Sequence, residues 1–390
     1  MSASTRRSLI AVVAATALLV SGCGGSDEGE AELTVYLSAP LSGPRAAEGR
    51  DIADGARLAL ADAGGEAAGI PVALEILDDA DGGGWDAALT GANARVATQD
   101  STTIAYIGEL DSGASRTSIP ITNEAGVLQV SPGSGAEDLT RETPASEDVP
   151  PAVQPSGVRT FGRVIPSDRV QGRAAGAWMA ELGITAVAVS EEGEFGAALV
   201  DGLESASPAP AIVPDGQSGA TFFARDSLEA SKGEALTPSG ENPIFAPDAL
   251  LATEDRFPLK AFAELCASVS DCPNPPREIR VTAAAMATSQ LPAEAAGFLD
   301  AFEVEYDRRP QPIAAYGYEA MAVVLDSLER ADDPLDRTAV VESFLATIDR
   351  ESILGTYSID AVGDTSLAAL GAYEIGPGGP VPEPEPLDAG

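Results

Sequence analysis

A strand, a helix and a second strand follow one another in the stretch TTIAYIGELDSGASRTSIPITNEAGVLQVSPGSG, residues 102–135. Residues 102–110 and 127–135 begin as apolar runs typical of buried strands, and residues 112–126 between them are typical of a helix. Strands joined through a helix pair in parallel, and helices then cover both faces of the sheet. The stretch therefore predicts an α/β fold.

The same alternation continues on both sides of this stretch. Towards the N-terminus we expect strands at 31–40 and 70–80, and helices at 50–65 and 85–98. A second series follows the proline-rich segment 143–157, which is typical of a surface excursion near a lobe boundary. Its expected strands and helices, in chain order, are 159–167, 168–183, 184–192 and 194–205. Two such series predict two lobes, each a parallel sheet flanked by helices.

The pattern becomes irregular after residue 205. Strands are expected at 209–216 and 219–224, but a parallel crossover needs about a dozen residues, so a helix is missing between them. The remaining expected elements are strands at 242–251 and 277–286, helices at 293–306 and 314–331, and a closing hairpin from 351–365 and 371–376. Residues 376–390 are proline-rich and predict a disordered tail.

The first 23 residues are typical of an export signal. Arg6 and Arg7 precede the apolar run 9–20, which is too short to span a bilayer. The run ends in Val-Ser-Gly-Cys, which resembles the lipobox of bacterial lipoproteins and makes Cys23 the expected site of lipidation. The alternative is an ordinary secretory signal with an incidental cysteine. Residues 24–31 are then a flexible tether, and the expected location is extracytoplasmic, on the cell membrane through the lipid anchor alone.

The composition excludes several classes of function. A formal charge of −38, with Lys232 and Lys260 as the only lysines, argues against a nucleic-acid partner. The plain alternative meaning of this charge is solubility. The chain has no histidine, which excludes Ser-His-Asp and Cys-His catalysis and histidine-bound metals. In an oxidising compartment, Cys266 and Cys272 are expected to form a local disulfide, so we expect neither a metal site nor a cofactor.

Small polar residues follow three of the expected strands. In an open parallel sheet, ligands lie beyond the carboxyl ends of the strands, where helices begin. Ser112 and Gly113 stand at such a helix start, where free N–H groups, a hydroxyl and a close backbone approach suit a carboxylate. The loops 131–135 and 42–44 lie at the same edge. A plain helix N-cap is the alternative role of Ser112, but three such loops favour a small-ligand site.

Several blocks in family order resemble the leucine-binding-protein family, the type I periplasmic binding proteins that serve branched-chain amino-acid ABC importers. The resemblance covers most of residues 32–205 and 281–375. It implies two lobes, joined by three crossover strands, that close on an amino acid. The blocks that carry it are residues 37–65, 78–83, 104–140, 163–183, 194–203 and 314–331.

The resemblance also implies roles for residues of the first lobe. Ser112 would bind the ligand carboxylate with its hydroxyl and N–H, and the Gly133 carbonyl would accept from the ammonium group. Gly135 stands where the family has a threonine, so its amide would remain while the hydroxyl is lost. Ser134 is a candidate to replace that hydroxyl.

From the second lobe, the resemblance assigns Asp248 to the ligand ammonium and Phe195 to the wall of the pocket. Four positions depart from the family pattern: Glu48 replaces a covering tyrosine, Asp111 and Asp81 replace a disulfide, and Asp226 replaces a pocket aromatic. The charges of Glu48, Asp111 and Asp226 favour a cationic or polyhydroxyl ligand, or else they are solvated charges at the edge of the pocket.

The predicted boundaries are 32–159 plus 284–351 for the first lobe and 160–283 plus 352–375 for the second. The predicted function is capture of a small amino-acid-like ligand by closure of the lobes, and delivery to the permease of an ABC importer. Two alternatives keep this fold, a ligand-sensing ectodomain and a degenerate protein that has lost its ligand. A serine hydrolase using Ser112 or Ser115 is the alternative of another class, but the chain has neither histidine nor a Gly-x-Ser-x-Gly motif, so we expect no enzyme.

Overall fold

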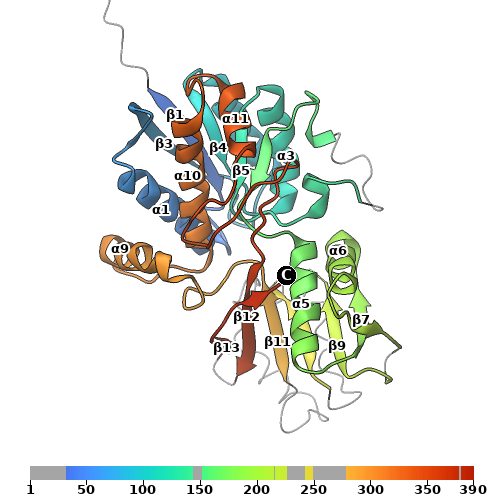
Figure 1. Ribbon diagram of the computed structural model, residues 1–390. Helices are drawn as coiled ribbons and strands as arrows, with labels where there is room; N and C mark the ends of the chain where they lie inside the picture. The colour runs from blue at the N-terminus through green and yellow to red at the C-terminus, as the bar shows by residue number, and fades with distance from the viewer. Residues whose placement is uncertain (1–31, 144–151, 215, 226–241, 249–277, 377–378) are drawn as a thin grey trace, which may run out of the picture. The chain divides into compact units, whose positions relative to one another are not determined.

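Six strands form the first sheet of the computed structural model, in the order β2-β3-β1-β4-β5-β6 (Figure 1). The structure describes residues 32–143, 152–214, 216–225, 242–248, 278–376 and 379–390. All neighbours in this sheet pair in parallel except β2 and β3. Its strands are β1 Leu33–Ala39, β2 Glu66–Ala67, β3 Ile70–Asp78, β4 Thr103–Ile107, β5 Leu128–Ser131 and β6 Phe161–Arg163.

Helices cover both faces of the first sheet, because the buried side chains of each strand alternate between two cores. Leu37 and Ile107 point into the core with α1, α10 and α11, whereas Tyr36 and Tyr106 point into the core with α2 and α3. The helices are α1 Ala46–Asp62, α2 Ala87–Gln99, α3 Ser112–Glu124, α9 Ala296–Tyr306, α10 Ile313–Arg330 and α11 Arg337–Leu345, with short 3₁₀ turns at Glu137–Leu139 and Ala293–Ala295.

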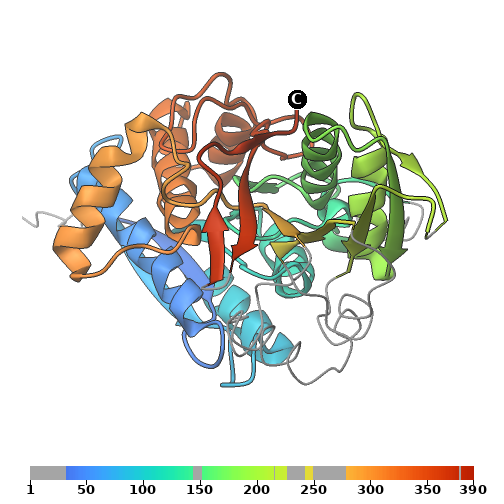
Figure 2. The same cartoon turned by 90° about the horizontal axis from the view of Figure 1, so that it is seen from below.

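Two glycines let α1 and α10 lie side by side (Figures 1 and 2). A Cβ atom at Gly55 would lie 2.1 Å from the Ala314 carbonyl oxygen, and one at Gly317 would lie 2.3 Å from that of Ile52. Only glycine leaves room for backbones this close.

The second sheet has the order β13-β12-β11-β10-β9-β7-β8, with β14 paired to β12. It is parallel from β8 to β11 and antiparallel where β12 joins β11, β13 and β14. Trp178 of α5 packs edge-on against Phe245 of β10. Its strands are β7 Ala186–Glu191, β8 Ala211–Ile212, β9 Ala220–Ala224, β10 Ile244–Pro247, β11 Ile279–Ala283, β12 Ala369–Gly376, β13 Gly379–Pro382 and β14 Leu387–Asp388, and its helices are α5 Asp168–Glu181 and α6 Gly193–Glu204.

The predicted two-lobed α/β fold is confirmed, and the chain passes between the two sheets three times: after β6, after β11 and before β12. The described residues between β8 and β9 contain no helix; β7 lies between these strands in the sheet, so the connection crosses it. Helix α11 and strand β2 were not expected from the sequence. No helix of the described part of the chain has the length and apolar character needed to cross a membrane.

Three expectations are wrong in detail. Residues 161–163 were expected in the second lobe, but they form β6 and pair with β5 in the first sheet. Leu354 and Tyr357, also expected in the second lobe, pack in the first core. The tail is not disordered, because residues 379–382 and 387–388 pair with β12 (Figures 1 and 2). The remaining lobe boundaries stay predictions.

Candidate functional site

A cavity of about 1140 Å³ lies at the carboxyl end of the first sheet and is lined by residues of both lobes. The start of α3 and the loops after β4 and β5 supply one wall. The starts of α5 and α6, the end of β11 and Tyr373 of β12 supply the other. Seven residues chosen from the sequence lie in its lining: Glu48, Ser112, Gly113, Gly133, Gly135, Phe195 and Asp248.

Ser112 is not the N-cap of its helix. Asp111 holds that position without a side-chain cap bond, and the first backbone bond of the helix runs from Ser115 N to Asp111 O, at 3.0 Å. The N–H groups of Ser112 and Gly113 precede that bond and lie at the cavity wall, where an anionic group would be favoured. The Ser112 Oγ accepts a hydrogen bond from Ala136 N at 3.2 Å, which joins the two loops.

The glycines of the lining are required by packing within the protein. A Cβ atom at Gly113 would lie 2.5 Å from Cζ2 of Trp85, and one at Gly133 would lie 2.7 Å from the Leu110 carbonyl oxygen. At Gly135 the Cβ would lie 2.2 Å from the Asp168 Oδ1. A larger residue at 135, such as the family's threonine, would therefore displace the Asp168 carboxylate.

Ser134 does not line the cavity, so the structure does not support it as a replacement for that threonine. Its side chain is fully buried behind the wall, where its Oγ lies 2.7 Å from the Ser115 Oγ and donates to the Glu109 carbonyl oxygen at 3.1 Å. The hydroxyl ties two loops together instead of facing a ligand.

Glu48 and Asp111 are paired acids. Arg45 contacts both, with an Nη2 to Oε2 distance of 2.6 Å to Glu48. Burial lowers the pKa of Arg45, but the two carboxylates outweigh it, and the net shift is upward. The Oδ1 of Asp81 instead accepts from Gly83 N, at 3.0 Å. Glu48 and Asp111 therefore share one guanidinium group, and the three side chains together keep a single net negative charge.

Asp248 follows β10 and reaches the cavity from the second lobe. Its Oδ1 accepts from Gln171 Nε2 at 2.9 Å, and its Oδ2 accepts from Ala284 N at 3.3 Å. Burial raises the pKa of Asp248, and these two hydrogen bonds oppose the rise. The carboxylate is thus held in one orientation, with acceptor capacity left for a ligand.

Asp168 is a cavity residue that sequence reasoning missed. It is the first residue of α5, is only 8% exposed, and within the described part of the chain its carboxylate has no hydrogen bond or ion pair. Burial raises its pKa to about 7; Arg163 lowers it, while Glu137, Asp248 and Asp138 raise it. Acidic residues are common in the first turn of a helix, so nothing in the sequence indicated that Asp168 would line the cavity.

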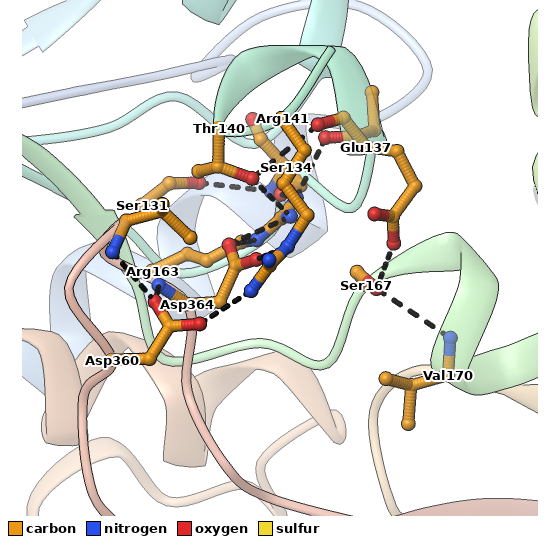
Figure 3. Close-up of polar contacts among 12 residues, drawn as sticks. Ser131, Ser134, Glu137, Thr140, Arg141, Arg163, Ser167, Val170, Asp360 and Asp364 are labelled. Carbon is orange, nitrogen blue, oxygen red and sulfur yellow. Dashed lines mark hydrogen bonds and ion pairs between the residues drawn. The ribbon is translucent and has the colours of Figure 1, made fainter. Parts of the chain in front are cut away.

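A network of ion pairs and hydrogen bonds beside the cavity joins β6 to the loop after β5 and to the segment that leads into β12 (Figure 3). The buried Arg163 guanidinium contacts Asp364 at 2.9 Å and donates to the Ser134 carbonyl oxygen at 3.1 Å. Arg141 contacts both Asp364 and Asp360. The network fixes the loop after β5 to the segment that leads into β12.

Asp226, Cys23, Cys266 and Cys272 lie outside the described residues, so their expected roles stay predictions. Among the residues that the structure does describe, no group of three or more Asp, Glu or Cys side chains is placed to hold a metal ion.

Residues 32–210 match the family model of periplasmic binding proteins, and no curated protein sequence matches the chain. The solved leucine-binding protein LivK of Thermotoga maritima is 20% identical, with a TM-score of 0.66 over 91% of this chain and 99% of that chain. A substrate-binding protein of an ABC transporter from Desulfitobacterium hafniense, in complex with Leu, is 18% identical, with a TM-score of 0.69 over 90% of this chain and 100% of that chain.

A solute-binding protein of an ABC transporter from Rhodopseudomonas palustris BisB5, solved with 3,4-dihydroxybenzoic acid, is 17% identical. Its TM-score is 0.64 over 92% of this chain and 98% of that chain. Identities at this level establish the fold, and the two-lobed type I periplasmic-binding-protein fold expected from the sequence is confirmed.

Proposed function

Since residues 32–210 match the family model of periplasmic binding proteins, we propose that the chain is an extracytoplasmic solute-binding protein that delivers a small ligand to an ABC importer. The observation that carries this proposal is the cavity, because its lining comes from both lobes. A ligand that contacts Ser112 of the first lobe and Asp248 of the second stabilises only the arrangement of the lobes in which it can touch both residues. The permease of the importer would recognise that arrangement.

The ligand class that fits best is an amino-acid-like molecule with an ammonium group. The N–H groups at the start of α3 suit a carboxylate, and Asp248 suits a cation. One of the structurally similar proteins was solved with Leu and another with 3,4-dihydroxybenzoic acid. A plain aromatic acid would leave Asp248 without a ligand cation, which favours the amino-acid-like class.

A thermal-shift screen of the purified chain tests this function. The panel contains amino acids, amides, polyamines and short organic acids, including benzoate. We expect at least one amino-acid-like compound to raise Tm, and Ser112→Ala and Asp248→Asn to reduce that rise. A complete absence of hits would favour the degenerate protein that has lost its ligand.

The lipid anchor is part of the same proposal. It is supported by the lipobox-like sequence that ends at Cys23. Expression of the chain and of Cys23→Ala, followed by separation of membranes, tests it; we expect only the unaltered chain to remain with the membrane.

A further inference from the structure

Two acids at the carboxyl end of the first sheet are buried behind the wall of the cavity. Asp79 follows β3 and Glu109 follows β4, the two strands that flank β1. Asp79 is 1% exposed and Glu109 is fully buried. Within the described part of the chain, both carboxylate oxygens of Asp79 and the Oε2 of Glu109 have no hydrogen-bond donor. Because a buried charge without a partner is costly, these oxygens indicate that the two acids are not both ionised.

The two side chains face each other. Side chains alternate along a strand, and Leu77 of β3 packs in the core with Tyr106, so Asp79, two residues after Leu77, points to that same face. The Glu109 side chain points there too, because its Oε1 accepts from the Tyr106 hydroxyl at 2.7 Å. The two carboxyl groups lie within hydrogen-bonding reach of each other. One proton between them therefore satisfies an oxygen of each acid.

The groups around this pair supply no cation that would compensate two charges. They come from β3, β1, β4, α2 and the residue before α3, and they are Asp78, Ser38, Tyr106, Asn93 and Asp111. Two of them are acids, and Asp111 is already paired with Arg45. Burial raises the pKa of both Asp79 and Glu109, and the Asp79 charge raises that of Glu109 further. Since the Oε1 of Glu109 is occupied by Tyr106, its Oε2 is the atom that carries the proton.

The main chain of Glu109 holds the wall of the cavity. Its N–H donates to the Ser115 Oγ at 3.2 Å. Its carbonyl oxygen accepts from the Ser131 Oγ at 2.8 Å and from the Ser134 Oγ at 3.1 Å. These bonds join the loop before α3 to the loop after β5, and both loops line the cavity. Repulsion between two buried carboxylates would displace Glu109 and loosen both loops.

We propose that Asp79 and Glu109 share one proton in the folded chain, and that this proton makes Glu109 a positioning residue for the cavity wall. At neutral pH the Glu109 Oε2–H donates to the Asp79 carboxylate. At alkaline pH the proton leaves for the solvent, both carboxylates are charged, and the loops before α3 and after β5 become less ordered. On the premise that the cavity binds a solute, its affinity falls as that proton is lost.

Glu109→Gln tests the shared proton, because its amide can donate to Asp79 at every pH. Denaturant unfolding of both chains from pH 5 to pH 9 measures the difference between their midpoints. The folded pKa of Glu109 lies above its unfolded value, so the unaltered chain loses stability as the pH rises. We expect the midpoint of the variant to exceed that of the unaltered chain by an amount that grows with pH. Asp168 is present in both chains, so its titration cancels. A difference that does not change with pH would overturn the shared proton.

A second variant guards against a folding defect in the first. Asp79→Asn also leaves the pair with one negative charge, so its midpoint at pH 9 should exceed that of the unaltered chain. Glu75→Gln is the matched control, since it makes the same change at an exposed acid of β3, and its effect on the midpoint should be the same at every pH.

Hydrogen exchange tests the positioning role without any solute. At pH 9 we expect amides of residues 109–115 and 131–135 to exchange at least threefold faster in the unaltered chain than in Glu109→Gln, and at pH 6 equally fast. Equal exchange at both pH values would overturn the positioning role.

Calorimetric titration at pH 6 and pH 9 tests the effect on binding, with L-leucine and every compound that raises Tm in the thermal-shift panel as probes. The loss of affinity between the two pH values should be at least threefold larger in the unaltered chain than in Glu109→Gln. An equal loss in both chains would overturn the link to binding. If no compound binds, the proposed function fails, whereas unfolding and hydrogen exchange still decide the shared proton and the positioning role.

Discussion

Glu319 in the first core and Asp168 in the cavity are both buried acids, but among the described residues only the Glu319 carboxylate has hydrogen-bond partners. Glu319 on α10 is 1% exposed, accepts from Arg350 Nε at 2.8 Å and accepts from the Tyr357 hydroxyl at 2.7 Å. Burial raises the pKa of Glu319, and Arg350 and Tyr357 oppose the rise. The acid of the core is compensated within the protein, whereas the acid of the cavity has no such partner among the described residues.

The largest effect is expected when the compensated acid loses its cation. Arg350→Gln should lower the free energy of unfolding by about 4 kcal/mol, because it leaves the buried Glu319 carboxylate without its cation. Denaturant unfolding measures this change. The matched control is Arg57→Gln, which removes an exposed arginine from Asp54 while Asp54 keeps Arg308, and it should cost about 0.5 kcal/mol. Equal losses of unfolding free energy in the two variants would contradict the claim that Arg350 compensates the buried Glu319 carboxylate.

Removing the charge of the uncompensated acid should have the opposite sign. At pH 8 and without ligand, Asp168→Asn should raise the free energy of unfolding by about 3 kcal/mol, because a buried charge without a partner disappears. The same denaturant experiment reads it out. A loss of stability in this variant would show that Asp168 has a structural partner.

The free energy of unfolding should also depend on pH through the titration of Asp168. Burial raises the folded pKa of Asp168 to about 7, above its ordinary value of 3.8, with Glu137, Asp248 and Asp138 adding to the rise and Arg163 opposing it. The folded state therefore binds more protons between about pH 4 and pH 7, and stability from this group is lost as the pH rises through that window.

The unfolding free energy of Asp168→Asn minus that of the unaltered chain should consequently grow from pH 4 to pH 7 and then level off. Chemical unfolding at a series of pH values measures this difference. A constant difference across the window would mean that Asp168 does not titrate there.

The smallest effect concerns the wall of the first lobe. Ser112→Ala removes the acceptor of the Ala136 N–H and one donor for the ligand, so it should cost about 1 kcal/mol of stability and weaken the bound solute about fivefold. Calorimetric titration and denaturant unfolding measure the two parts. An unchanged affinity would place the ligand away from the start of α3.

Most of the first lobe could be predicted because its strands and helices have regular periodicity and clear ends. Strand β6 was misplaced, since a three-residue strand after a proline-rich segment carries too little pattern to show its partner. The tail was misread because Pro380 and Pro382 are typical of loops, yet an edge strand such as β13 tolerates proline.

The sequence was sufficient to predict those site residues whose position follows from the topology of the sheet. Ser112, Gly133 and Gly135 reach the cavity because the loops after parallel strands meet at one edge of the sheet. The direction of a side chain was not predictable, so Ser134 was expected at the cavity but is buried behind its wall, and Asp168 was missed. Both depend on contacts between residues far apart in the chain, such as the approach of Asp168 to Gly135.

Hydrogen exchange of the purified chain, with and without the compound that gives the largest thermal shift, tests most directly whether a solute binds between the lobes. We predict that the ligand slows amide exchange both at the start of α3 in the first lobe and at the start of α5 in the second. Slower exchange confined to one lobe, or to neither, would contradict a solute site shared by the two.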